Sequence, residues 1–306
     1  MRTAAVVVDW RRPEETLCAL SSLAAMTPPP DVLICVENGC TAEGIEAVRS
    51  GAPQGATILE IPSNVGFAAA VNRGMERVLQ AGAEWVLLLN NDATVSPQCL
   101  SRCLDEVAAR PHLAATGPAI RFADQPDRLW YGGGQVNDWL AFTRHRGLMG
   151  PAAKPPPSGD TAFVTGCCML ISAAAWRAVG PFRADFFAYY EDAEWCQRAR
   201  AAGWSCSYVG EVLCAHAVSV SSFLRGSLGL SEKTAYYKAR NPMRYALDTR
   251  SWSKRLTRVL GLMVVWNAYH AWRLFQSRDP RIARAYVRGI ADAFQGCMGE
   301  YVEARK

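Results

Sequence analysis

The sequence lacks several features that would define its class at once. No part of its 306 residues is apolar for the ~20 residues that a membrane-spanning helix needs. The N-terminus also lacks the basic and then apolar pattern of a signal peptide. The 11 cysteines include no CxxC pair, which argues against a zinc ribbon or a disulfide framework. These absences favour a cytoplasmic protein in which cysteine serves as a small apolar residue.

Two further absences exclude particular enzymes. Residues 9–13 contain no glycine, although a Rossmann dehydrogenase carries a glycine-rich motif directly after its first strand. A processive polysaccharide synthase would need membrane spans. The net charge of +5 is unevenly placed, because residues 1–249 carry −2 and residues 250–306 carry +7. A nearly neutral body argues against nucleic-acid binding, and the basic tail predicts contact with something anionic.

Three apolar runs, each typical of a strand buried on both faces, end abruptly on polar side chains. They are residues 4–8 before Asp9, residues 32–36 before Glu37 and Asn38, and residues 85–89 before Asn90, Asn91 and Asp92. Ligands of open α/β sheets bind beyond the carboxyl ends of such strands, so the acids predict a site for a cation-carrying ligand. For Asp9, capping of the next helix is an equal alternative. For Asp92 it is weaker, because Ser96 is the expected cap of the helix that follows.

Strands and helices alternate up to about residue 116, which predicts an α/β protein with a mostly parallel sheet. The expected helices lie at residues 14–25, 42–50, 68–80 and about 97–110. Residues 121–160 are rich in glycine and proline and are interpreted as a long loop. A buried strand at 163–172, a helix at 190–202 and mainly helical structure from 231 onward complete the prediction.

Three other segments have both a functional and a structural interpretation. Glu191, Asp192 and Glu194 follow an aromatic run and open a helix, where the helix dipole alone would explain them, but one of them is also suited to act as a general base. His216 is one of only four histidines and is either structural or a ligand of Mn²⁺ or Mg²⁺. The turn at 64–68 either faces a phosphate or nucleoside at a helix N-terminus or is a simple glycine turn.

In this order, the segments resemble the family 2 glycosyltransferases, in particular the rhamnosyltransferase-like branch, over about residues 4–245. The matching segments are residues 6–8, 36–39, 64–68, 72–74, 87–92, 164–171, 190–192 and 198–203, followed by His216 and residues 236–241. The resemblance implies a GT-A fold, a doubly wound and mostly parallel sheet flanked by helices. We therefore expect a catalytic domain at 1–249, and the charge asymmetry predicts a basic helical tail at 250–306.

The resemblance further implies the roles of individual residues. Asp192 is the expected catalytic base, and Asp92 and His216 are the expected ligands of a divalent metal, Mn²⁺ or Mg²⁺. The expected donor-binding residues are Asp9, Glu37, Asn38, Asn64, Gly66, Asn72, Asn91 and Asp92. The expected acceptor-side residues are Gly166, Tyr190, Glu191 and Trp195. The implied reaction moves a sugar with inversion from a nucleotide-diphosphosugar to a hydroxyl group.

The donor and acceptor stay open at this point. Glu37 stands where the family has an aspartate, and Cys40 stands where it has a serine, so the nucleobase is not assigned. A dTDP-sugar such as dTDP-rhamnose and a UDP-hexose are both compatible donors. A lipid-linked glycan, a polysaccharide end and a small metabolite are all compatible acceptors. A non-catalytic protein that binds sugar nucleotides is the alternative function.

The tail combines apolar, aromatic and basic residues at helical spacing. Its apolar members are Leu256, Val259, Leu260 and Met263, then Trp266, Tyr269, Trp272 and Phe275. Its basic members are Lys254, Arg255, Arg258 and Arg273, then Arg278, Arg281, Arg284 and Arg288. One interpretation is a helix on an anionic membrane surface, which would place the protein on the inner face of the membrane. Packing on the catalytic domain or a homodimer contact is the equal alternative.

Overall fold

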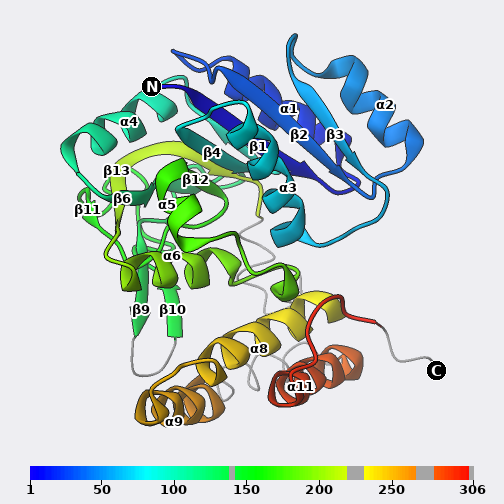
Figure 1. The fold of residues 1–306 in the computed structure, drawn as a ribbon, viewed down its shortest axis with the longest axis vertical. Coiled ribbons are helices and arrows are strands. Elements are labelled where there is room, and N and C mark those ends of the chain that lie inside the picture. Colours follow the sequence, from blue (N-terminus) through cyan, green and yellow to red (C-terminus); the bar gives the residue numbers. More distant parts are fainter. Residues whose placement is uncertain (138–141, 219–230, 267–278, 303–306) are drawn as a thin grey trace.

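The first part of the chain folds as alternating strands and helices, as its apolar runs predict. The structure, a computed structural model, describes residues 1–137, 142–218, 231–266 and 279–302. Four parallel strands lie in the order β3-β2-β1-β4, with three connecting helices packed on them (Figure 1). Their bounds are β1 Thr3–Asp9, α1 Pro13–Ala24, β2 Val32–Asn38, α2 Ala42–Gly51, β3 Thr57–Ile61, α3 Phe67–Gln80 and β4 Trp85–Asn90.

The strand register brings the three polar strand ends to one edge of the sheet. β1 and β4 are buried along nearly their whole length because their side chains are apolar on both faces. Asp9 pairs with Glu37 across β1 and β2, and Val8 pairs with Asn90 across β1 and β4. Asp9 and Glu37 therefore lie at the carboxyl ends of β1 and β2, and Asp92 lies just beyond that of β4, all at the edge where ligands of such sheets bind.

Gly74 allows α3 to approach the sheet, and its replacement is a test of this packing. A Cβ at Gly74 would lie 2.5 Å from Cγ1 of Val6 and 3.2 Å from Cγ2 of Val36. Both valines are buried in a close-packed sheet, so the new methyl has no space. We expect Gly74→Ala to lower the free energy of unfolding by about 1–3 kcal/mol in denaturant titrations. Gly44→Ala, in the open first turn of α2, is the control, and an equal effect of both variants would contradict the prediction.

An antiparallel strand joins the two halves of the sheet. β12 (Cys168–Ser172) lies between β4 and β6 (Leu113–Thr116) and runs antiparallel to both. β13 (Ser205–His216) runs parallel to β6 and to β7 (Pro118–Phe122). The strand expected at 163–172 is thus confirmed for its last five residues. Between β12 and β13 lie α5 (Ala173–Val179), the 3₁₀ turn η1 (Ala184–Phe186) and α6 (Glu191–Ala201).

The long loop predicted for residues 121–160 is wrong. This segment contains β8 (Leu129–Tyr131), β9 (Gly134–Asn137), β10 (Phe142–His145) and β11 (Gly159–Asp160). Its glycines allow backbones and rings to come close. A Cβ on Gly134 would lie 2.4 Å from the Phe163 ring, and one on Gly132 would lie 2.8 Å from the carbonyl oxygen of Arg146. Glycine in short strands marks such close approach, so the composition was misread as a loop.

The helix cap predicted at Ser96 is also wrong. Residues Ala93–Val95 form β5, which pairs antiparallel with β13, and α4 spans Cys99–Ala109. Gln98 precedes α4 and makes no side-chain cap hydrogen bond. The backbone N–H of Ser96 donates instead to the carbonyl of Leu213 in β13, at 2.8 Å. Pairing with a distant strand therefore overrides the local signal for a helix start.

The chain from residue 231 onward is mainly helical in its described part, as predicted. The helices are α8 Glu232–Leu247, α9 Trp252–Gly261, the π-helical turn η2 Leu262–Trp266 and α11 Pro280–Gln295. They lie below the sheet in Figure 1, with α11 packed along α8. Among the described residues, no helix is long and apolar enough to cross a membrane. The domain boundary expected at residue 249 falls between α8 and α9 and stays a prediction.

Candidate active site

Asp92 and His216 meet at the edge of the sheet, although 124 positions separate them in the sequence. Asp92 follows β4, and His216 is the last residue of β13. The pairing of β13 with β5 places His216 opposite Ala93, beside Asp92. As a result, Nε2 of His216 lies 3.0 Å from Oδ1 of Asp92. The two side chains therefore lie together, and their binding of one shared cation stays a prediction.

The pair lies in a largely buried and partly aromatic environment. The side chain of His216 is 6% exposed, whereas that of Asp92 is 23% exposed and remains open to a ligand. Trp130 of β8 meets the imidazole edge to face, with ring centroids 4.4 Å apart. Burial opposes ionisation of Asp92, but the hydrogen bond and charge of His216 outweigh it and hold the pKa of Asp92 below its usual range.

The geometry of this pair fits a divalent cation. A carboxylate and an imidazole form a donor set that suits Mn²⁺ and also occurs with Mg²⁺. Neighbouring ligands of an octahedral ion at about 2.1 Å lie about 3 Å from each other. The two ligand atoms here are 3.0 Å apart. Two protein ligands also leave positions for substrate phosphate oxygens and water, as such ions prefer.

A second acidic cluster, at the ends of β1 and β2, is less suited to a cation. Asp9, Glu37 and Cys40 each place a ligand atom within 4.8 Å of the others. However, the Cys40 thiol donates to Oδ2 of Asp9 at 3.2 Å, and burial raises the pKa of Cys40 to about 12. A thiol binds metal as its thiolate, so an ion here would have to remove a strongly held proton. The Asp92–His216 pair is therefore the better candidate.

The carboxylate of Asp9 accepts several hydrogen bonds from groups of its own chain. It is fully buried, and its Oδ1 accepts hydrogen bonds from the N–H of Arg12 at 3.1 Å and the hydroxyl of Thr16 at 2.7 Å. The same oxygen accepts from Nδ2 of Asn91 at 3.1 Å. Asp9 does not cap α1, whose N-cap is Arg12 and which has no side-chain cap hydrogen bond. It holds Asn91 and the turn before α1 in place, and its donor-binding role stays a prediction.

Glu37 has one carboxylate oxygen without a partner. Its Oε1 accepts from the Cys35 thiol at 3.6 Å, whereas its Oε2 is buried and makes no hydrogen bond to any described residue. Burial raises the pKa of Glu37, and the charge of the neighbouring Asp9 adds to this effect. A buried acceptor without a donor is costly, so this oxygen suits a ligand N–H group.

Asn38, Asn64 and Gly66 shape the turn that leads into α3. Nδ2 of Asn38 donates to Oδ1 of Asn64 at 3.0 Å, and the N–H of Gly66 donates to the same oxygen at 2.9 Å. Gly66 has φ +87°, and a Cβ there would lie 2.6 Å from the carbonyl oxygen of Phe187. Glycine is thus required both by the backbone conformation and by space. A donor-binding role for this turn stays a prediction.

Asp192 lies in the first turn of α6 and is tied to the end of β4. Its Oδ2 accepts the N–H of Gly166 at 2.8 Å, and its Oδ1 accepts the N–H of the following residue at 2.7 Å. The carbonyl of Cys167, next to Gly166, accepts the N–H of Asn90 at 2.9 Å. Residues 166 and 167 therefore join Asp192 to the strand that delivers Asp92.

Burial raises the pKa values of both carboxyl groups at the start of α6. For Glu191 burial is the main cause, and the charge of Asp192 adds to it. For Asp192 burial is opposed by backbone N–H groups, first that of Gly166. An acid whose pKa is closer to neutrality takes up a proton more effectively, so Asp192 is suited to act as a general base.

The raised pKa of Glu191 predicts a pH-dependent effect on stability. Glu191 is 5% exposed, and its buried Oε2 has no described partner. Its charge destabilises the fold above the raised pKa, and this penalty disappears below the unfolded pKa of about 4.3. We expect Glu191→Gln to raise the Tm at about pH 8, with a difference that shrinks toward about pH 4. Calorimetry across this range is the measurement, and an unchanged Tm at the upper end would contradict the prediction.

Residues 2–234 match the model of the family described as "Glycosyltransferase like family 2". The chain belongs to glycosyltransferase family 2. The resemblance predicted from the sequence is thereby confirmed.

Relatives of known name agree with this assignment. The glycosyltransferase is similar to the N-acetylglucosaminyl-diphospho-decaprenol L-rhamnosyltransferase of Mycobacterium tuberculosis, with 27% identity over 243 residues, which cover 71% of this chain and 77% of the relative. It is also similar to the galactofuranosyltransferase GlfT1 of the same organism, with 32% identity over 177 residues, 57% of this chain and 55% of that one. The chain is accordingly an enzyme of the glycosyltransferase class.

Solved structures show that the glycosyltransferase has the GT-A fold. The mannosyltransferase PcManGT from Pyrobaculum calidifontis, in complex with GDP-Man and Mn²⁺, matches with a TM-score of 0.58 and 16% identity, over 95% of this chain and 75% of that one. S. aureus TarS 1–349 in complex with UDP-GlcNAc matches with a TM-score of 0.58 and 12% identity, over 97% and 82% of the two chains. The predicted fold class is confirmed.

Two predicted site residues of the glycosyltransferase make hydrogen bonds that stabilise the fold. Asn72 exchanges two hydrogen bonds with the backbone of Phe182, at 2.9 and 3.0 Å, and so joins α3 to the segment after α5. Trp195 is fully buried, and its Nε1 donates to the carbonyl of Gly180 at 2.8 Å. These contacts give both side chains a structural task, and the donor-side role expected for Asn72 and the acceptor-side role expected for Trp195 stay predictions.

The other residues around Asp192 differ in how many of their groups are already bonded within the fold. Glu194 is buried and paired with Arg198 at 2.8 Å, so it is not available as a base. Tyr190 precedes α6 in the left-handed conformation, and its ring lies 5.4 Å from that of Tyr245 in α8. The acceptor-side roles of Tyr190, Glu191 and Gly166 stay predictions.

Trp130 and His145 of the glycosyltransferase were not predicted from the sequence to lie beside the site. The Trp130 ring lies between the rings of His145 and His216, at centroid distances of 4.5 and 4.4 Å. Burial lowers the pKa of His145 to about 4, so its ring is neutral at physiological pH. Both residues lie in the segment misread as a loop. The apolar run at 129–131, bounded by turn residues, was the available signal for a strand.

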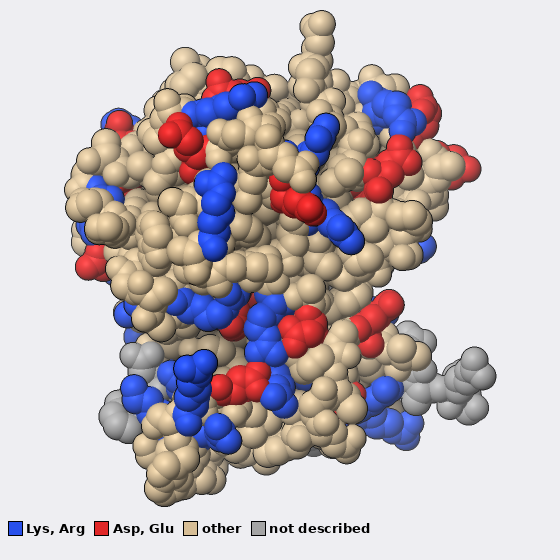
Figure 2. Space-filling view, in the orientation of Figure 1, with Lys and Arg blue, Asp and Glu red and all other residues tan. Residues whose placement is uncertain are grey.

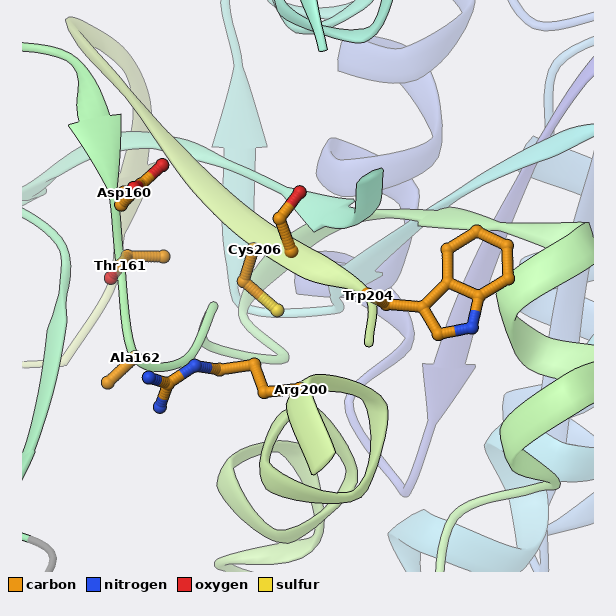
Figure 3. A pocket seen from close by; sticks show the side chains of 7 residues that line it. Asp160, Thr161, Ala162, Arg200, Trp204 and Cys206 are labelled. Atoms are coloured by element: carbon orange, nitrogen blue, oxygen red, sulfur yellow. The ribbon is translucent and has the colours of Figure 1, made fainter. Parts of the chain in front are cut away.

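A hollow of about 320 Å³ lies away from this site (Figure 3). It is lined by Asp160, Thr161, Ala162, Arg200, Trp204, Ser205 and Cys206. Ser205 opens the 12-residue strand β13, whereas His216 closes it. The hollow is therefore at the opposite end of that strand and does not belong to the Asp92–His216 site.

Proposed function

We propose that this enzyme transfers a sugar, rhamnose or a hexose, from a dTDP- or UDP-sugar to an acceptor hydroxyl with inversion of configuration. The observation that carries the proposal is the Asp92–His216 pair, joined through residues 166 and 167 to the carboxylate of Asp192. The Asp92–His216 pair would provide ligands for a divalent cation on the donor diphosphate. Asp192 would provide the base for the acceptor hydroxyl.

The proposal gives a role in this reaction to Asp192, Glu37, Asp92 and His216. Asp192 takes the proton of the attacking hydroxyl, while the N–H of Gly166 keeps its carboxylate oriented. Glu37 accepts an N–H of a pyrimidine base through its unpartnered Oε2. Asp92 and His216 hold Mn²⁺ or Mg²⁺, which when bound neutralises the charge of the leaving diphosphate. A single base and direct attack predict inversion at the anomeric carbon.

A nucleotide-sugar panel tests this proposal. The enzyme is incubated with dTDP-rhamnose and several UDP-hexoses, with Mn²⁺, with Mg²⁺ or with a chelator, and the release of nucleoside diphosphate is followed. The proposal expects release from at least one donor, loss of it in chelator, and an inverted anomeric centre in the NMR spectrum of the product. A retained centre, or an equal rate in chelator, would overturn it.

The proposed acceptor is a lipid-linked sugar that carries phosphate. A hollow of about 450 Å³ between α6 and the α8–α9 junction is lined by Arg200, Lys254 and Arg258 and by no acid. Tyr245, which also lines it, contacts Tyr190, two residues before Asp192. These basic side chains would attract a phosphate group that is attached to the accepting sugar. The relative's name specifies a diphosphate-linked acceptor, whereas a glycan end or a small metabolite would leave the cations unused.

The same helices support attachment to an anionic membrane on its inner, cytoplasmic face. Apolar side chains of α9 and η2 project to solvent, with Trp252 75%, Leu256 49% and Leu260 53% exposed. Val259, also predicted on this face, packs inward against Met243 and its neighbours. In Figure 2 the lower end of the molecule, where α9 lies, is largely uncharged, with Lys and Arg just above it. Tyr269, Trp272, Arg273, Phe275 and Arg278 lie outside the described residues, as does the side chain of Trp266.

Liposome co-sedimentation tests this attachment. We expect binding to anionic vesicles that weakens at high salt and is lost when Trp252, Leu256 and Leu260 are all replaced by serine. Because these side chains are exposed, the triple variant should keep its Tm. Equal, negligible sedimentation with anionic and neutral vesicles would contradict the membrane role. A parent protein that elutes as a dimer and a variant that elutes as a monomer would assign this face to a homodimer instead.

A further inference from the structure

Two fully buried polar side chains of α8, Arg240 and Asn241, have no task in the chemistry described above. Arg240 is among the largest fully buried side chains described. Burying a charge and an amide is unfavourable unless their hydrogen bonds are satisfied. The hydrogen-bond partners of these two side chains should therefore show what they stabilise.

Most of their N–H groups point at the backbone of one short segment, residues 185–189, whereas Nη1 of Arg240 donates to the carbonyl of Gly299 at 2.7 Å. Nδ2 of Asn241 lies 2.8 Å from the carbonyl oxygen of Ala188 and 2.7 Å from that of Tyr189. Nη2 of Arg240 lies 2.8 Å from the carbonyl oxygen of Phe186, which Asn241 also approaches at 3.1 Å. The Nε of Arg240 donates to Oδ1 of Asn241 at 2.9 Å and fixes the orientation of the amide.

The segment held in this way has a strained backbone. Phe187, Tyr189 and Tyr190 have φ values of +67°, +69° and +77°, which L-residues other than glycine rarely adopt. Such conformations persist only where the surrounding structure imposes them. Residues 186–190, here called the aromatic turn, are therefore kept in shape by hydrogen bonds from α8.

The aromatic turn connects the start of α3 with the start of α6, which carries Asp192. Its Phe187 carbonyl accepts the N–H of Ala68, at the start of α3, at 3.2 Å. At its other end the carbonyl of Tyr190 accepts the N–H of Glu194 and so begins α6. Asp192 lies two residues after Tyr190. The shape of the turn thus sets where Asp192 stands relative to the turn that enters α3.

We propose that Arg240 and Asn241 are positioning residues that act on the reaction through the aromatic turn. This inference rests on the proposed role of Asp192 as the base. The two side chains touch neither donor nor acceptor. They hold the turn so that the Asp192 carboxylate meets the acceptor hydroxyl at the required distance, and small displacements of a reacting group are costly to the rate.

Asn241→Ala and Arg240→Lys are the test variants, and Met243→Ala is the control. Met243 is buried on the same helix but packs with Ala246, Leu262 and Ala293, away from the turn. We expect both test variants to lower kcat by at least about tenfold with little change in donor binding. Met243→Ala should lower the Tm with kcat preserved. If Asn241→Ala does not fold, Arg240→Lys, which keeps the charge, carries the test.

A double-variant comparison separates positioning from general damage. If Asn241 acts through Asp192, adding Asn241→Ala to Asp192→Asn should cost little further rate, because the positioned group is already absent. A full additional loss would overturn the proposal, as would normal kcat in folded Asn241→Ala or Arg240→Lys. Normal turnover in Asp192→Asn alone would instead overturn the assigned base, and with it the proposed function.

Discussion

Replacing Asp192 with asparagine is expected to lower turnover by about 10²–10⁴-fold, the usual contribution of a positioned general base. Asparagine keeps the size of the side chain and can still accept the N–H of Gly166 through its amide oxygen. It cannot accept the proton of the acceptor hydroxyl. Donor binding should therefore change little, because Asp92, His216 and Glu37 are untouched. Steady-state kinetics with saturating donor, together with direct titration of the nucleoside diphosphate, measure both quantities.

The neighbouring acids provide matched controls for this variant. Glu191→Gln should keep most of the rate. Glu194→Gln should act mainly on stability, because it breaks the buried pair with Arg198. Near-normal turnover in Asp192→Asn together with an inactive Glu191→Gln would move the role of base to Glu191. The raised pKa of Asp192 also predicts that the acidic limb of the kcat/KM profile lies above the usual range of aspartate.

The second large effect is expected at the cation site. Asp92→Ala and His216→Ala should each weaken Mn²⁺-dependent binding of a nucleoside diphosphate by more than the roughly 10–100-fold that loss of an outer-shell partner costs. Isothermal titration with and without Mn²⁺ separates this effect from contacts to the base and ribose. Without the ion, the variants and the parent should bind the nucleotide alike.

His112→Ala serves as the control for loss of a histidine. His112 contacts Trp204 and precedes β6, at the opposite end of the sheet from His216. It should bind Mn²⁺ and nucleotide like the parent. If Asp92→Ala and His216→Ala also did so, the cation would have to lie elsewhere, with Asp9, Glu37 and Cys40 as the remaining described cluster.

The strand ends were predictable because one physical rule covers them. An apolar run that is buried on both faces gives way to polar side chains where the strand ends, and Asp9, Glu37 and Asn90 all lie in the last two residues of their strands. Such runs therefore show both where the strand ends and where its polar residues gather. The strands at 129–131 and 134–137 gave a weaker signal, because they are short and the glycines at 132–134 are typical of both loops and close packing.

Within the site, the proximity of residues was easier to predict than their orientation. Asp92 and His216 come from distant segments and lie 3.0 Å apart, because both lie where strands end at the same edge of the sheet. Trp195 and Asn72 lie on helices, where a shift of one position changes the face that a side chain occupies. Arg240 and Asn241 could be noticed as a motif, but their targets are backbone carbonyls, which no pattern of side chains reveals.

The distance along the chain between Asp92 and His216 has a consequence for folding. The first four strands can assemble from local βα units, whereas this pair forms only after β13 has docked and closed a loop of 124 residues. A nascent chain would therefore form the sheet edge with Asp9, Glu37 and Asp92 before His216 completes the proposed cation site. An ion that binds only the completed fold stabilises it by mass action, so the resistance of this enzyme to heat should follow the concentration of free Mn²⁺ or Mg²⁺ around it.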